Sequence, residues 1–557
     1  MTRGGRYQLT LSQTDVIYPG AMFEQILNPT GHLWSTVLIA LVPLVILILM
    51  LAVFRVTAWL STILGGAITV GLAVTVWHTP VANAMRSYLF GGLTGIWSID
   101  WITFWGLMIF NTLVLTGNFQ RFKGWMIHHA TADVRIQTIM LAWAFGALLE
   151  GLVGFGYPWA VIVPILTGLG IADLEAIRVA ALANNAPVSY GALGAPIIGL
   201  AAVTSLPLIT LSGSIGNVVA ILALLPPWVL IFLVSGWEGV AEAWPLAIVG
   251  SLSYIAGQWP VAHYLGPYLP DISGALVSFW ILFLFVKIWR PQTIRGFGGV
   301  RLEPTAASPT DSEKPSSVGD VFLAWLPYIV LILVVVLWTG PWSKLPAISL
   351  LRLSVAAKSS ITQKPVSSVF NFTPLSGGTS ILASWLVILS ILRPNGATLR
   401  RVFLRTFQQI WGALLVAFFI FALAYVFVYS GMANSLGYGL SKIGIFFVVL
   451  APILGWIGVA LSGSNTSTNA MFGPVQMVTG RLLNLPALLL PSLNSVGAEV
   501  GKPIAPQTAS VGVSTSKFVR SEGQVIRHNM GWTLVLLGYL ILIALLFYYV
   551  FPGSMSL

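Results

Sequence analysis

Residues 33–54, LWSTVLIALVPLVILILMLAVF, form an unbroken apolar run without a charged side chain. A helix of roughly 20 apolar residues crosses the hydrocarbon core of a bilayer, which is about 30 Å thick. This run therefore predicts a membrane-spanning helix. Residues 532–551, WTLVLLGYLILIALLFYYVF, predict a second one close to the other end of the chain.

Similar runs fill the interval between these two stretches. They lie at residues 58–77, 87–117, 136–149, 178–203, 215–235, 245–256, 272–289, 321–339, 377–392, 406–430 and 445–461. Only 8% of the 557 residues are charged, whereas soluble proteins average about 25%. We therefore predict an all-α polytopic membrane protein with about 12 to 14 transmembrane helices. This leaves no room for a separate soluble catalytic or nucleic-acid-binding domain.

Charged residues indicate how the chain is arranged across the membrane. The formal net charge is +11, and basic side chains cluster in four loops between spans, at 121–135, 287–301, 393–405 and 517–527. By the positive-inside rule these loops are cytoplasmic, in a multi-pass protein of the cell membrane.

The same patterns predict five regions of the chain. They are a polar, frayed N-terminal segment at 1–32, a first membrane half at 33–290, a Pro-, Gly- and Ser-rich cytoplasmic linker at 291–320, a second membrane half at 321–557, and within that half an amphipathic insertion lying on the surface at 340–375.

Several kinds of chemistry are missing from the sequence. It has no cysteine, no HExxH motif and no GxxxxGK[ST] loop, so it offers no thiolate metal site and no nucleotide-binding loop. We expect no cofactor and no metal, and a membrane-embedded enzyme is the least favoured class.

The two membrane halves carry a weak internal repeat. Gly146 and Gly154 match Gly455 and Gly463, and Asn184 matches Asn494 at almost the same spacing. The basic loops at 121–135 and 517–527 fall opposite loops with little charge, so equivalent loops lie on opposite sides. This is typical of inverted-topology repeats in secondary transporters. The corresponding site segments are 146–196 and 455–508.

Each repeat also contains two stretches that break a helix, at 150–158 and 184–191 in the first and at 462–469 and 501–508 in the second. Open backbone at membrane depth is tolerated only where it is buried in protein or lines a wet cavity. Free N–H groups at broken helices attract anions. We therefore expect broken or re-entrant helices at a substrate site.

Three charged residues lie in or beside these breaks. A charged Glu150 in its apolar surroundings would cost at least ~2.5 kcal/mol, which makes it a candidate for carrying a proton. The alternative is a carboxylate bonded to backbone N–H groups at a hairpin tip. Lys502 is a candidate for binding a substrate carboxylate, or it snorkels to the interface. Glu499 is a second proton-coupling candidate, or the local partner of Lys502. Asp271, which precedes a span, is expected to be its N-cap.

Five segments, in order, carry a family resemblance: EGLVGFGYP at 150–158, NNAPVSYGALGAPI at 184–197, GPYLPD at 266–271, GWIGVALSGSNTSTNAMF at 455–472 and GKPIAPQTA at 501–509. Together they resemble the L-lactate permease family of bacterial and archaeal secondary transporters, from about residue 33 to 551. The resemblance implies import of L-lactate, and in some members D-lactate or glycolate, together with protons by alternating access. The chain departs from the family pattern at Asn465 and Glu499, which leaves the coupling ion open.

The breaks and the resemblance together supply the candidate substrate-binding residues. These are Gly154, Phe155, Gly156, Asn184, Asn185, Ser189, Ser464, Asn465, Thr466, Ser467, Asn469, Lys502, Gln507 and Thr508. The hydroxyl and amide groups of the run 464–469 suit a carboxylate, a substrate hydroxyl or Na⁺, although such a run can instead cap its own helix ends.

The favoured hypothesis is a proton-coupled symporter of 2-hydroxymonocarboxylates. Its partners are L-lactate or a related acid, the proton and the lipid bilayer, and an oligomer is left open. A Na⁺-coupled carboxylate carrier is the alternative. A passive anion channel is less favoured.

Overall fold

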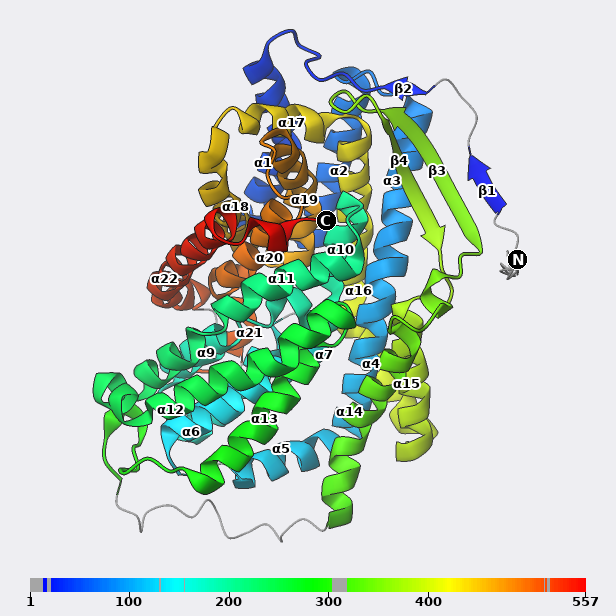
Figure 1. Cartoon of the computed structure of the whole chain (residues 1–557). Coiled ribbons are helices and arrows are strands. Elements are labelled where there is room, and N and C mark those ends of the chain that lie inside the picture. Colours follow the sequence, from blue (N-terminus) through cyan, green and yellow to red (C-terminus); the bar gives the residue numbers. More distant parts are fainter. Residues whose placement is uncertain are drawn as a thin grey trace, which may run out of the picture.

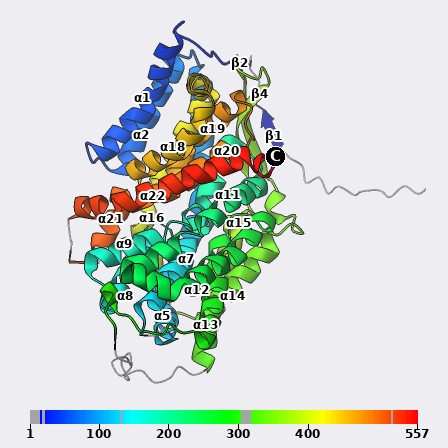
Figure 2. The same ribbon diagram turned by 60° about the vertical axis from the view of Figure 1, so that its left-hand side comes forward.

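The structure is a computed structural model that describes residues 14–17, 22–129, 132–154, 156–302, 318–514, 516–517 and 521–557. It is built almost entirely of helices, with one small sheet at its edge (Figures 1 and 2).

The helices before the 291–320 segment start with three long apolar ones. In order they are α1 (Leu33–Ala52), α2 (Ala58–Thr75), α3 (Val81–Thr94), a π-helix (Gly95–Asp100), α4 (Trp101–Leu115), α5 (Asn118–His129), α6 (Val134–Gln137), a second π-helix (Thr138–Phe145), α7 (Gly146–Leu152), α8 (Tyr157–Gly168), α9 (Asp173–Ala183), the 3-10 turn η3 (Val188–Tyr190), α10 (Gly191–Thr204), α11 (Leu208–Leu222), α12 (Pro226–Tyr264) and α13 (Pro270–Ile288).

A second set of helices follows that segment. They are α14 (Val318–Thr339), α15 (Gly377–Leu392), α16 (Gly396–Tyr429), α17 (Met432–Ser441), α18 (Phe447–Ser462), α19 (Asn465–Leu482), α20 (Leu489–Gly501), the 3-10 turn η7 (Lys502–Ile504), α21 (Pro506–Ser514) and α22 (Glu522–Tyr549).

Within the described residues, nine helical stretches are long and apolar enough to cross a membrane, or up to ten if a bent pair counts as one span. This number is below the predicted range of about 12 to 14. The number is lower partly because two expected spans are joined in one continuous helical stretch of 57 residues, Leu208–Tyr264, and are counted once. The number is also lower because the apolar helices Tyr157–Gly168 and Gly377–Leu392 are too short to be counted as spans.

The outer surface of the bundle is apolar. Leu38, Leu333 and Leu542 expose 66%, 55% and 63% of their surface. In water such exposure over many helices would be unfavourable, whereas lipid chains match it. The exposed leucines therefore fit a protein embedded in a bilayer.

All four predicted helix breaks are present. In the first half, α7 ends at Leu152 and α8 begins at Tyr157, with Gly154 at φ +66° between them. α9 and α10 are separated by η3, and the two helical parts are bent by 70°. Broken helices of this kind leave backbone groups free to meet a ligand.

The second half repeats this pattern. α18 ends at Ser462 and α19 begins at Asn465, with Gly463 at φ +74° between them. α20 and α21 are separated by η7, as α9 and α10 are by η3. The two glycines with positive φ hold matching places in the proposed repeats. The inverted orientation of the repeats itself remains a prediction.

The insertion at 340–375 differs from the predicted amphipathic segment, because it forms a β-hairpin. β3 (Leu351–Lys358) pairs antiparallel with β4 (Pro365–Phe372), with Leu351 opposite Phe372 and Lys358 opposite Pro365. Within β3, apolar Leu351, Leu353 and Val355 alternate with Arg352 and Ser354, which is the period-2 pattern of a strand.

The N-terminal segment also takes part in this sheet. β1 (Thr14–Ile17) and β2 (Phe23–Glu24) both pair parallel with β3, so these residues are not frayed as expected. The sheet lies against the outer side of α3 and α16, away from the lower ends of α12 and α13 (Figures 1 and 2).

The beginning of the 291–320 segment is anchored at Arg295 while its other residues stay partly or fully exposed, and residues 303–317 lie outside the described residues. The buried Arg295 donates two hydrogen bonds to Glu242, at 2.7 and 2.9 Å, and the buried Arg135 donates one to the same carboxylate at 3.0 Å. Glu242 thereby raises the pKa of Arg295 above its usual value. This network ties the segment to α12 and to the start of α6.

Candidate functional site

All four helix breaks meet at one cavity of about 480 Å³, within the range of small-molecule sites. The first break contributes Glu150, Val153, Gly154 and Tyr157, the second Val188 and Gly191, the third residues 462–467, and the fourth Lys502 and Gln507. Parts of α1, α2, α4, α10, α16 and the first π-helix complete the wall. Tertiary packing thus brings together segments that are more than 300 residues apart in the sequence.

A buried ion pair forms part of the cavity wall. Lys502 Nζ donates to Glu150 Oε1 at 2.7 Å, and the side chains expose 8% and 1% of their surface. Asn184 Nδ2 donates to the other carboxylate oxygen of Glu150 at 3.0 Å. A partner on each oxygen fixes the carboxylate, and such a pair is strong where water is excluded.

The close approach of α10 also positions Glu150. A Cβ added at Gly191 would lie 2.6 Å from Glu150 Oε1, closer than real Cβ atoms approach other atoms. Only glycine leaves room for the carboxylate at this point. This explains a glycine at the start of α10 without recourse to an unusual backbone angle.

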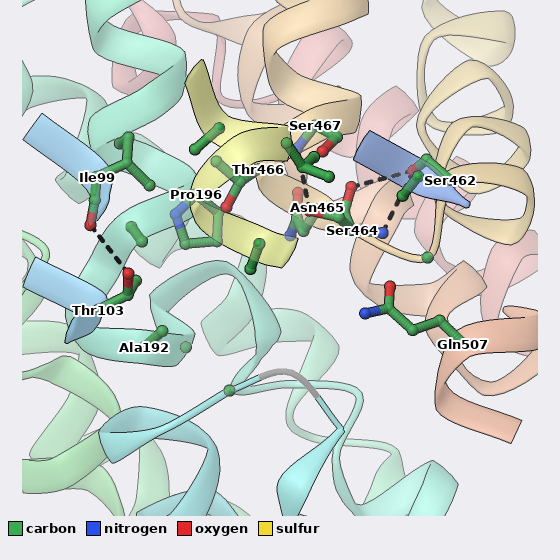
Figure 3. A pocket seen from close by; sticks show the side chains of 18 of the residues that line it. Ile99, Thr103, Ala192, Pro196, Ser462, Ser464, Asn465, Thr466, Ser467 and Gln507 are labelled. Carbon is green, nitrogen blue, oxygen red and sulfur yellow. Dashed lines mark hydrogen bonds between the residues drawn. The ribbon is translucent and has the colours of Figure 1, made fainter. Parts of the chain in front are cut away.

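The tip of α19 presents polar groups to the cavity. Ser464 caps its own helix, since its Oγ accepts a hydrogen bond from Ser467 N at 3.2 Å. Asn465 donates to Ser495 O at 3.2 Å. Within the described part of the chain, the side chains of Thr466, Ser467 and Gln507 form no hydrogen bond, and all three line the cavity. Figure 3 shows Thr466 beside Pro196 and Gln507 approaching from below Ser464.

Several predicted residues lie behind the wall rather than in it. Asn469 is fully buried, donates to Pro196 O and Ser495 Oγ, both at 3.1 Å, and accepts from Asn494. Asn184, Asn185, Ser189, Glu499, Thr508 and Gly156 are also absent from the cavity lining. The amide of Asn469 thus holds α10, α19 and α20 together in this structure, and its contact with substrate stays a prediction. Phe155 lies outside the described residues.

Two breaks also pack directly on one another. Thr508 Oγ1 donates to Lys502 O at 2.8 Å, and a Cβ at Gly156 would lie 2.7 Å from Thr508 Cγ2. Thr508 therefore shapes the loop that carries Lys502, and Gly156 leaves room for it.

Glu499 is not the partner of Lys502. Its Oε1 accepts a hydrogen bond from Ser189 N at 2.7 Å, and Ser189 Oγ lies 2.8 Å from Ser495 Oγ. Glu499 thus joins the second break of the first half to α20. Its other oxygen, Oε2, is buried without a hydrogen-bond partner among the described residues.

Asp271 is not an N-cap either. Leu269 holds the cap position of α13, and Asp271 Oδ1 instead accepts from Tyr254 OH at 2.9 Å. This buried contact links α12 to α13 next to α7, because a Cβ at Gly151 would lie 2.8 Å from Asp271 Cβ.

Sequence reasoning missed part of the wall. Trp59 and Thr62 of α2, Asp100 and Thr103 around the start of α4, and Gln409 of α16 all line the cavity. Asp100 had the same signal as Glu150, an acid in an apolar run, GIWSIDWITF at 95–104. The others carry no local signal, since only packing places them beside the breaks.

In the part of the chain that the structure describes, no group of three or more His, Cys, Asp or Glu side chains is placed to hold a metal ion. The charged chemistry of the cavity therefore rests on its two acids and one lysine.

The fold and the cavity can now be compared with known proteins. A family model described as L-lactate permease matches residues 36–551, nearly the whole chain. This chain belongs to the L-lactate permease family. Membership confirms the resemblance seen in the five segments and the prediction of a membrane permease rather than an enzyme. Together with the apolar helices, this membership also confirms the prediction of a multi-pass membrane protein, which in bacteria resides in the cell membrane.

Relatives within the family align over almost their whole length. A glycolate permease of Escherichia coli (strain K12) is 33% identical, covering 96% of this chain and 99% of its own. An L-lactate permease of Bacillus subtilis (strain 168) is 31% identical, covering 94% and 97%. An L-lactate permease of Escherichia coli (strain K12) is 29% identical, covering 92% and 96%.

One solved structure has a similar fold. The YdaH transporter of Alcanivorax borkumensis aligns with a TM-score of 0.50 at 14% identity, covering 90% of this chain and 100% of its own. At that identity the likeness concerns the fold alone.

Proposed function

We propose that this permease imports L-lactate or a closely related short 2-hydroxymonocarboxylate, D-lactate or glycolate included, together with protons by alternating access. The names of its relatives, lactate and glycolate permeases, support this substrate class. The cavity of about 480 Å³ has ample room for a molecule of this size.

The observation that carries the proposal is the ion pair between Glu150 and Lys502. The pair is neutral and faces the cavity. A substrate carboxylate that takes Lys502 leaves Glu150 without its cation, and an unpaired carboxylate buried in a membrane is costly. A proton on Glu150 removes that charge. Anion and proton therefore enter together, and the group of Glu150, Lys502 and bound anion is neutral again.

The remaining wall supports recognition of a 2-hydroxyl group. Thr466, Ser467 and Gln507 offer hydroxyl and amide groups without a partner among the described residues. Thr466 and Ser467 lie on the third break, and Gln507 lies on the fourth break, which also carries Lys502. A monocarboxylate held at Lys502 would thus have its 2-hydroxyl within reach of neutral donors and acceptors.

Uptake of labelled L-lactate into proteoliposomes tests this function. We expect an inward pH gradient to drive accumulation with Na⁺ absent on both sides, and unlabelled glycolate to compete. Accumulation that needs a Na⁺ gradient and ignores the pH gradient would replace the proton by Na⁺ and refute the coupling proposed for Glu150. Absence of any lactate or glycolate uptake would refute the substrate class.

A further inference from the structure

A second acid, Asp100, lies in the cavity wall and has no role in the exchange described above. It ends the π-helix Gly95–Asp100, which leads directly into α4. The residue is 5% exposed, and its Oδ2 is buried without a hydrogen-bond partner among the described residues. π-Helical turns are frequent at functional sites, where they redirect a side chain.

The neighbouring groups do not compensate a charge on Asp100. The hydroxyl of Thr103 donates to the backbone oxygens of Ile99 and Asp100, at 3.2 and 3.3 Å, rather than to the carboxylate. Lys502 is the one basic side chain that lines the described cavity, and Glu150 already holds it. No ion pair to Asp100 occurs within the described residues.

Packing keeps Asp100 in this place. A Cβ at Gly95 would lie 2.5 Å from Ala417 O, so the π-helix is pressed against the backbone of α16. The elements that pack on the π-helix (α3, α4, α10 and α16) contribute no Asp, Glu, Lys, Arg or His to the lining besides Asp100 itself. Among the described lining residues, no basic side chain is therefore left for Asp100.

The charges of the cavity wall show why Asp100 has to be neutralised when an anion binds. The titratable side chains of the wall are Asp100, Glu150, Lys502 and Tyr157. With both acids ionised the wall carries one excess negative charge, which repels a monocarboxylate. A proton on Glu150 balances the incoming anion, and Asp100 still leaves one negative charge in a site of low dielectric.

We propose that Asp100 is a second proton-binding site, so that two protons accompany each monocarboxylate and uptake carries net positive charge inward. This inference rests on the proposed function and adds its stoichiometry. A proton is favoured over Na⁺ because a proton needs only the carboxylate oxygen itself, whereas Na⁺ needs several oxygen ligands arranged around it.

Stoichiometry is measurable as the limiting accumulation ratio. Each coupled proton contributes a factor of about ten per pH unit when the membrane potential is clamped at zero. A one-unit inward gradient therefore supports about 100-fold accumulation for two protons and about tenfold for one. The potential is clamped with K⁺ and valinomycin, and Na⁺ is omitted.

We expect about 100-fold accumulation by the parent protein and about tenfold by Asp100→Asn, which keeps size and polarity but cannot titrate. Asp271→Asn is the matched control, an equally buried acid outside the cavity, and should behave as the parent does. If Asp100→Asn does not fold, Asp100→Ser serves as the second variant.

Tenfold accumulation by the parent, or an unchanged ratio in the Asp100 variant, would overturn the proposal while leaving lactate–proton symport intact. A parent ratio that rises on addition of Na⁺ would overturn it too, in favour of Na⁺ at Asp100. A parent without any pH-driven accumulation would instead refute the proposed function itself.

Discussion

Lys502 and Glu150 are 352 residues apart in the chain, yet Nζ of the lysine lies 2.7 Å from Oε1 of the glutamate. The contact joins the first break of one half to the last break of the other, at the wall of the cavity. Each charge depends on the other, because neither has a second ion-pair partner within the described residues. Substrate binding at Lys502 therefore has a direct consequence at Glu150.

Glu150→Gln should uncouple one proton from transport. The amide keeps the size of the side chain but no longer has to be neutralised when the substrate takes Lys502. For a one-unit pH gradient we expect lactate accumulation to fall about tenfold, whereas exchange of external labelled lactate for internal unlabelled lactate continues. Counterflow and gradient-driven uptake in the same proteoliposomes separate these effects. Unchanged accumulation would show that Glu150 is structural.

Gly191→Ala should displace Glu150 from Lys502. The added methyl group would lie 2.6 Å from Glu150 Oε1, and overpacking in a dense interior typically costs about 1 to 3 kcal/mol. We expect a lower thermal unfolding midpoint and weaker lactate uptake. Gly146→Ala is the matched control in α7, because its new methyl group would meet only Ile162 Cγ1, at 3.9 Å. Equal behaviour of the two variants would contradict the packing argument.

Thr466→Val tests how the 2-hydroxyl is recognised. Loss of one neutral hydrogen bond costs about 0.5 to 1.5 kcal/mol, so lactate affinity should fall by roughly two- to twelvefold. Propionate, which lacks the hydroxyl, should bind the parent more weakly than lactate and should be little affected by the substitution. Competition against labelled lactate measures both affinities.

Thr468→Val is the control for this experiment. Thr468 Oγ1 donates to Ser464 O at 2.9 Å, behind the cavity lining, so its loss should lower stability without changing the ratio of lactate to propionate affinity. Equal binding of the two acids to the parent would show that the hydroxyl is not recognised.

Glu242→Gln should loosen the segment that follows α13. Glu242 accepts hydrogen bonds from Arg135, Arg295 and Thr293, and hydrogen bonds to charged groups contribute about 1.5 to 3 kcal/mol. We expect a clear drop in the unfolding midpoint. Glu238→Gln, whose side chain is 81% exposed, should change stability by less than about 0.5 kcal/mol.

The stabilisation by this network should persist at alkaline pH. Because Glu242 raises the pKa of Arg295 in the folded protein, this contribution is fully present below the pKa of the unfolded chain and is lost only above it. The pKa of an arginine in the unfolded chain lies well above pH 10, so the difference in stability between parent and Glu242→Gln should be constant from neutral pH to about pH 10. A difference that shrinks over this range would point to another group.

Much of the fold followed from local composition. Apolar runs predicted spanning helices because a bilayer accepts little else. Gly and Pro in runs such as 150–158 and 501–508 predicted the breaks because these residues favour open backbone. Glu150 was singled out because a charge in an apolar run needs a reason. Each inference needs only a local stretch of the chain, of roughly 20 residues at most.

Features that depend on distant contacts required the tertiary structure. The parallel pairing of β1 with β3, for example Thr14 with Leu351, joins residues more than 300 positions apart in the chain. The amide of Asn469 belonged to a polar run that suited a substrate, yet the packing of α10 and α20 commits it to neighbouring groups.

The charged residues divide in the same way. Sequence alone identified Glu150 and Lys502 as chemically important, because the membrane environment makes any charge costly. Only the folded chain decided that they pair with one another, that Glu499 contacts Ser189 instead, and that Asp100 faces the same cavity. Which charge neutralises which depends on distances of a few ångström between segments far apart in the chain, and no local pattern encodes these distances.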